Sequence, residues 1–74
     1  MYRFYIFVYT KDNILGECMG EGIEFTNESI ALFEYSTDTI LVLNSIKQLQ
    51  NHYKSLGEAK IEWVDIDSDS KKIN

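Results

Sequence analysis

The sequence predicts a single α+β domain, with a mostly antiparallel β-sheet in the order β-β-β-β-α-β and one amphipathic helix packed on one face. Three observations support this class. Residues 2–9 alternate with a period of two and are rich in aromatic and β-branched side chains, as in a strand. Polar turns at 11–13, 26–29 and 36–38 separate further short apolar segments. From Ser45 onward the apolar spacing changes to three and four residues, which indicates a helix.

The remaining strands follow from the segments between these turns. The second strand is expected over 14–25, where Gly16, Gly20 and Gly22 predict bulges or a bend. The other strands are expected over 30–35, 39–43 and 59–66. Short connections make the first four strands antiparallel neighbours.

The helix has recognisable start and stop signals. Ser45 can cap its first turn, with Gln48 three residues later. Gly57 stands where a left-handed C-terminal cap is expected. The apolar positions that should face the sheet are Ile46, Leu49, Tyr53 and Leu56.

Length and composition favour one small domain. The chain has 74 residues, 45% of them hydrophobic, which supports one core over 1–66 followed by a frayed polar tail over 67–74. A single cysteine, Cys18, cannot form an intramolecular disulfide, whereas small secreted domains usually need several. There is no signal-peptide pattern and no run of about 20 apolar residues. We therefore expect a cytoplasmic protein without a membrane segment.

The first strand has more apolar surface than one helix can cover. Phe4, Ile6 and Val8 lie on one side, so the aromatic residues between them point to the opposite side. Either the sheet curls toward a small barrel that encloses these residues, or the second face meets another copy or another protein.

Charge is distributed unevenly along the chain. The net charge is −5, and no basic residue lies between Lys11 and Lys47. Two interpretations remain open: solvated positions that keep a small domain soluble, or an acidic surface that meets a basic partner. The acidic residues of this stretch are Asp12, Glu17, Glu21, Glu24, Glu28, Glu34 and Asp38.

Patterns for catalysis, cofactors and metals are absent or incomplete. His52 is the only histidine, and Cys18 has no sequence signature of a nucleophile. Gly20 and Gly22 begin a dinucleotide-binding pattern, but Phe25 stands where its third glycine is needed. The aspartates at 65, 67 and 69 resemble the start of a calcium loop that is not completed. We predict no enzyme activity, no cofactor and no metal site.

A resemblance covers residues 20–65. Its motifs are Gly20-Glu21-Gly22-Ile23-Glu24-Phe25, then Ser29-Ile30-Ala31-Leu32, Asp38-Thr39-Ile40, Asn44-Ser45, His52 and Ile61-Glu62-Trp63-Val64-Asp65. This pattern resembles a family of short uncharacterised bacterial and phage proteins. The chain departs from it at Glu28, where the family has a turn glycine, at Phe33-Glu34, where it has Arg-Trp, and at Tyr53, where it often has glycine. The resemblance implies a bacterial or mobile-element origin and assigns no activity.

The functional prediction is a small acidic protein–protein interaction module, expected as a homodimer, of the kind that phages or prophages use as an inhibitor of host or defence machinery. The low pI of about 4.6 argues against direct nucleic-acid binding. The alternative is an oligomer that sequesters an anionic or nucleotide-like molecule, with Trp63 in the pocket and Arg3, Lys47 or Lys60 converging on the ligand. The candidate interaction surface consists of Tyr5, Phe7, Tyr9, Glu17, Glu21, Glu24, Glu28, Glu34 and Asp38.

Overall fold

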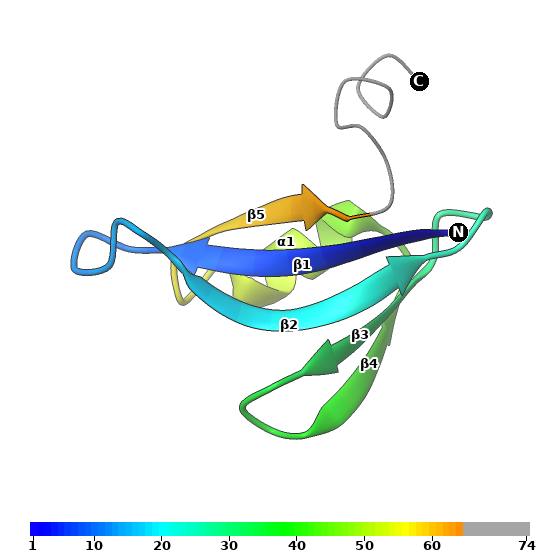
Figure 1. Ribbon diagram of the computed structural model, residues 1–74, viewed down its shortest axis with the longest axis horizontal. Coiled ribbons are helices and arrows are strands. Elements are labelled where there is room, and N and C mark those ends of the chain that lie inside the picture. Colours follow the sequence, from blue (N-terminus) through cyan, green and yellow to red (C-terminus); the bar gives the residue numbers. More distant parts are fainter. Residues whose placement is uncertain (65–74) are drawn as a thin grey trace, which may run out of the picture.

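The computed structural model describes residues 1–64 and contains one open, antiparallel, five-stranded sheet with one helix (Figure 1). The strands lie in the order β4-β3-β2-β1-β5, so β4 and β5 are the two edges. The predicted α+β class is confirmed, whereas the sheet is not closed into a barrel. The elements are β1 (Tyr2–Tyr9), β2 (Glu17–Glu24), β3 (Ile30–Glu34), β4 (Thr39–Leu43), α1 (Ile46–Tyr53) and β5 (Glu58–Trp63).

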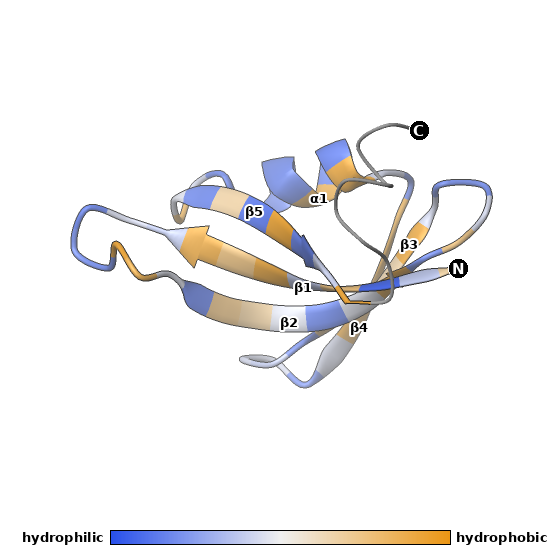
Figure 2. Cartoon of the chain, turned by 45° about the horizontal axis from the view of Figure 1, so that its top comes forward, coloured by the Kyte–Doolittle hydropathy of each residue, from blue (hydrophilic) through white to orange (hydrophobic). Residues whose placement is uncertain are grey.

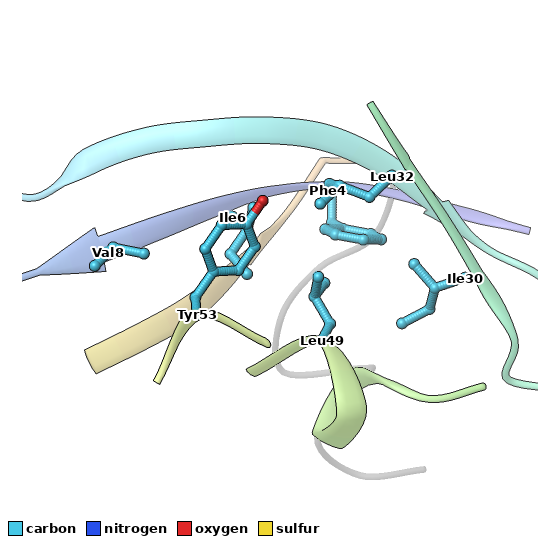
Figure 3. Packing of buried hydrophobic residues seen from close by; sticks show 7 residues of the cluster. All are labelled: Phe4, Ile6, Val8, Ile30, Leu32, Leu49 and Tyr53. Carbon is cyan, nitrogen blue, oxygen red and sulfur yellow. The ribbon is translucent and has the colours of Figure 1, made fainter. Parts of the chain in front are cut away.

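The hydrophobic core lies between the sheet and α1 (Figure 3). Leu49 and Tyr53 of α1 point toward the side chains of β1 and β3 and are 0% and 1% exposed. Burying such side chains contributes about 1.5–3 kcal/mol each, which makes this layer the main source of stability. The strand residues buried in this layer are Phe4, Ile6, Val8, Ile30 and Leu32.

The interior strand β1 pairs with β2 on one side and with the edge strand β5 on the other. Its alternation places Phe4, Ile6 and Val8 on the side of the helix, as expected from the sequence. Figure 2 shows the contrast between the two neighbours: β1 is apolar over the half that ends at its arrowhead, whereas β5 alternates hydrophilic and apolar residues.

The strand β2 differs from the sequence-based expectation at two points and agrees with it at one. The strand begins at Glu17, because residues 14–16 belong to the connection from β1, and Ile14 and Leu15 are exposed. The register shifts between Ile6 and Phe7, which is a β-bulge in this pair of strands. This agrees with the bulge predicted for β2 and lies next to Gly20. Gly22 instead allows close packing, because a Cβ there would lie 2.6 Å from the Ala31 carbonyl oxygen and 2.8 Å from the Phe4 ring.

The start of α1 is as predicted, whereas its end is not. The Ser45 hydroxyl accepts a hydrogen bond from the Gln48 N–H at 3.1 Å. The helix stops at Tyr53, and Leu56, expected on the apolar face, is 55% exposed. Gly57 does not adopt a positive φ. It is instead packed against β1, where a Cβ would lie 3.0 Å from the Val8 side chain.

Candidate interaction surface

The side of the sheet turned away from α1, which we call the outer face, is not covered by any other element among residues 1–64. Strand pairing places Tyr5, Glu21, Phe33 and Ile40 in one row across four strands. The next row is formed by Arg3, Ile23, Ala31 and Val42. The large apolar and aromatic side chains that the strands place on the outer face are Tyr5, Phe7, Tyr9, Ile23, Phe33, Ile40 and Val42.

Exposure is greatest where the outer face reaches β4. The side chains of Ile40 and Val42 are 70% and 78% exposed. Their neighbours Leu41 and Leu43 point the other way and pack against the core. The β4 segment is therefore apolar on both faces, although only one of them is buried.

A shallow hollow of about 300 Å³ lies within the outer face. Ala31 of β3 has a smaller side chain than its neighbours Ile23 and Phe33, and all three residues line the hollow. Tyr5, Glu21 and Ile40 also line it. This volume is at the lower end of the range for ligand pockets and suits a single apolar side chain of a partner.

Aromatic rings flank the hollow. The rings of Phe33 and Tyr35 meet edge to face at 5.9 Å between centroids. The Tyr35 hydroxyl donates a hydrogen bond of 3.4 Å to Glu21. Reduced hydration, followed by the nearby Cys18 and Glu21, raises the pKa of Tyr35 above its usual value of 10. Glu21 is thus the carboxylate placed among the aromatic residues.

The predicted aromatic residues Tyr5, Phe7 and Tyr9 all lie on the outer face. Phe7 and Tyr9 stack at 6.5 Å between ring centroids. Tyr9 is at the end of β1 away from the hollow, where its ring lies 5.6 Å from the Lys60 ammonium group.

The predicted acidic residues do not gather on one face. Of the six acidic residues in the candidate interaction surface, only Glu21 belongs to the outer face next to the hollow. Glu24 is 6% exposed, and Glu34 faces α1. Glu28 and Asp38 lie in the β2–β3 and β3–β4 turns with φ of 72° and 53°. Glu17 is exposed at the start of β2.

A second group of titratable residues lies on the helix side of the sheet. The Tyr53 hydroxyl donates a hydrogen bond of 2.5 Å to Glu34, and the Thr37 hydroxyl donates another of 2.8 Å. The His52 ring nitrogen is 3.7 Å from the same carboxylate. The hydrogen bonds from Tyr53 and Thr37, followed by the charge of His52, lower the pKa of Glu34. Burial of the Tyr53 hydroxyl, followed by its hydrogen bond to Glu34, raises the pKa of Tyr53.

The hydrogen bond between Tyr53 and Glu34 holds α1 against β3, because the hydroxyl of the buried Tyr53 side chain needs a partner.

Cys18 faces the outer side, opposite Phe7 in the register, and its thiol donates a 3.7 Å hydrogen bond to the Gly20 carbonyl. Cys18 and His52 therefore lie on opposite sides of the sheet and do not form a nucleophile–base pair.

We expect Tyr53→Phe to lower the free energy of unfolding at pH 7 by about 1.5–3 kcal/mol, because it removes a hydrogen bond to a charged group.

The lowered pKa of Glu34 also predicts that the stability of the protein depends on pH. A carboxyl whose pKa is lower in the folded state contributes stability that is complete above about 4.5, its ordinary pKa, and is lost as the pH falls through the lowered value. Urea denaturation of wild type and Glu34→Gln at pH 7 and pH 3 measures this contribution.

The difference in stability between wild type and Glu34→Gln should shrink at pH 3. Glu17→Gln, an exposed carboxylate of the same type, is the matched control. A difference of the same size at both pH values would contradict the role assigned to the ionised Glu34.

The three basic residues considered for an anionic ligand do not converge. Arg3 lines the hollow beside Glu21. Lys60 belongs to β5 near Tyr9, and Lys47 is exposed on α1. Trp63 faces the core side, where its ring centroid is 5.6 Å from that of Phe4.

Within residues 1–64 there is no group of three or more metal-ligating side chains. The aspartates at 65, 67 and 69, and the tail predicted over 67–74, lie outside the described residues. No helix in the described part of the chain is long and apolar enough to cross a bilayer. Comparison with family models, curated proteins and solved structures found no match.

Sequence reasoning missed the apolar residues that β2, β3 and β4 contribute to the surface. Ile23, Phe33, Ile40 and Val42 were assigned to strands but not to the surface. A signal was available, since 39–43 is apolar at every position after Thr39 and so has a second apolar side, as 2–9 does.

Proposed function

We propose that this protein is a small acidic module that binds another protein through its outer face. The observation that supports this proposal is the open sheet with a helix on one side only, which leaves Phe33, Ile40 and Val42 on an uncovered surface. Contiguous exposed apolar patches on small proteins are typical of interaction sites. No catalytic role is proposed, because Cys18 and His52 lie on opposite sides of the sheet.

The size of the outer face is suited to a protein partner. Strands spaced about 4.8 Å apart, with a rise of about 3.3 Å per residue, give a five-stranded sheet of roughly 20 by 25 Å. The flat projection of about 500 Å² is enlarged by the relief of the side chains and is of the same order as the roughly 800 Å² that each partner contributes to a typical interface.

The partner's expected chemistry follows from the hollow and from the charge. An apolar side chain of the partner would enter the hollow beside Phe33 and Ile40. Basic groups around that side chain would meet Glu21 and the net charge of −5. These features support a basic protein with an exposed apolar residue.

A more specific role is also part of the proposal. The resemblance to short bacterial and phage proteins, together with the small size and acidity, supports a phage- or prophage-type inhibitor of host or defence machinery. The single cysteine supports action in the cytoplasm. The alternative of a small-molecule sponge has less support, because only Arg3 of the three basic residues considered lines the hollow.

The proposal is tested by affinity purification from cells that naturally produce the protein, followed by titration of the recovered partner. Phe33→Lys places a charge in the hollow, and we expect it to weaken binding by at least about tenfold, as for a central interface residue. Asn51→Lys adds the same charge on the exposed side of α1 and should bind like wild type. Thermal melting of each variant verifies that it is folded.

Two results would overturn the proposal. One is a partner that binds wild type and Phe33→Lys equally well. The other is a partner whose binding is lost in Asn51→Lys but not in Phe33→Lys, which would place the contact on the helix side.

A further inference from the structure

The two edges of the sheet differ in chemistry. The outward positions of β5 are Glu58, Lys60 and Glu62, and such charges on an edge strand prevent pairing with another chain. In β4 the segment Thr39–Leu43 contains no charge and no proline. One edge is therefore protected against strand addition and the other is not.

The β4 edge is also open in the structure. Its residues pair with β3 on one side, and no strand lies beyond it within residues 1–64. In an antiparallel strand, alternate residues direct their N–H and C=O groups away from the neighbour. Part of the β4 backbone is thus available to a further strand, next to the exposed Ile40 and Val42.

We propose that β4 pairs antiparallel with β4 of a second copy of this chain, with the two-fold axis close to Leu41. In this register Ile40 lies opposite Val42 of the other copy, and Thr39 lies opposite Leu43. The same patch serves both copies, as a two-fold interface requires.

Charge favours a second copy at this edge. The two chains each carry −5, so they repel one another over most of their surfaces. In the proposed register every pair within the strands is uncharged, and Asp38 at the end of one strand meets Asn44 of the other. β-branched side chains opposite one another, here Ile40 and Val42, are favourable cross-strand pairs.

The pairing goes beyond the proposed function, because it gives the assembly a shape. A two-fold axis perpendicular to the sheet joins the two sheets into one of ten strands, with both outer faces on the same side. The two hollows, each lined by Ile40 next to the joined edges, would then be presented side by side. A five-residue edge buries little area, so the dimer is weak and concentration-dependent.

The test uses the purified protein and needs no other partner, so its outcome is independent of the proposed function. Sedimentation or light scattering over a wide concentration range should show a mass rising from 8.6 kDa toward twice that value. Val42→Lys should remain at the monomer mass, because two lysines would be brought beside the joined strands. Ile23→Lys changes a β-branched residue on the same face, two strands inward, and should still dimerise.

Amide hydrogen exchange supplies a second readout that locates the contact. Exchange at alternate residues of β4 should slow as wild type is concentrated, and this slowing should be lost in Val42→Lys. Ile40→Lys serves as a second edge variant if Val42→Lys does not fold.

Several results would overturn the proposal. Dimerisation that survives both edge variants but is lost in Ile23→Lys would mean that two outer faces pack together. A wild-type protein that stays monomeric at high concentration, or forms aggregates of unlimited size, would also refute it. Protection of β4 only when a different protein is bound would assign this edge to that partner.

Discussion

Replacing Leu49 by alanine is expected to lower the free energy of unfolding by about 2–5 kcal/mol, the range for deletion of a fully buried leucine side chain. Leu49 is 0% exposed and contacts the core between β1 and β3 (Figure 3). A domain of this length has a total stability of only roughly 4–11 kcal/mol. The variant should therefore lose a large part of its free energy of unfolding, as measured by urea denaturation followed by circular dichroism.

Leu56→Ala is the matched control for this change. The sequence places both leucines on the same apolar helix face, but Leu56 lies beyond the end of α1 and is 55% exposed. Its replacement should cost less than about 1 kcal/mol, because an exposed substitution leaves no cavity. Equal losses for the two variants would contradict the observed helix end.

Gly57→Ala is expected to destabilise the protein by about 1–3 kcal/mol through overpacking against the end of β1. A Cβ at this position would meet the Tyr9 carbonyl oxygen and would lie 3.0 Å from both the Thr10 methyl group and the Val8 side chain. The backbone oxygen of Tyr9 cannot move aside without disturbing β1.

Gly57→Asn separates this steric role from a left-handed cap. Asparagine tolerates a positive φ better than alanine, so it would be the milder change at a left-handed cap. At a position that is crowded but has no positive φ, the larger asparagine should be at least as damaging as alanine. Thermal melts of both variants distinguish these two roles. If Gly57→Asn were clearly more stable than Gly57→Ala, Gly57 would act as a left-handed helix cap.

Local sequence signals were sufficient for most of the architecture. The strand over 39–43 and the Ser45 cap were predicted at their observed positions, because each depends on neighbouring residues alone. The four consecutive antiparallel strands followed from short turns. Whether the sheet would close could not be predicted, since closure depends on how two distant edges approach each other.

The errors occurred where tertiary contacts override local preference. Gly57 looks like a helix cap in the sequence, but the approach of β1 gives it a different role. Leu56 continues the helical spacing, yet the chain leaves the helix after Tyr53 to enter β5. Ile14 fits a strand pattern and lies instead in the exposed β1–β2 connection.

The candidate surface was only partly predictable. The period-two alternation correctly predicted that the side chains of Tyr5 and Phe7 point away from the core. The acidic residues were grouped by their closeness in sequence, but strand alternation sends Glu21 and Glu34 to opposite sides of the sheet. The hollow could not be foreseen, because it depends on cross-strand register.

The position of β1 between β2 and β5 has a consequence for how the protein folds during synthesis. Within residues 1–64, the strand that is synthesised first pairs with the strand that is synthesised last, since Phe4 lies opposite Trp63. Until β5 has been translated, the nascent chain exposes one whole backbone edge of its most apolar strand. The sheet therefore cannot be completed before β5 has been synthesised, and long-range pairing of this kind makes folding comparatively slow.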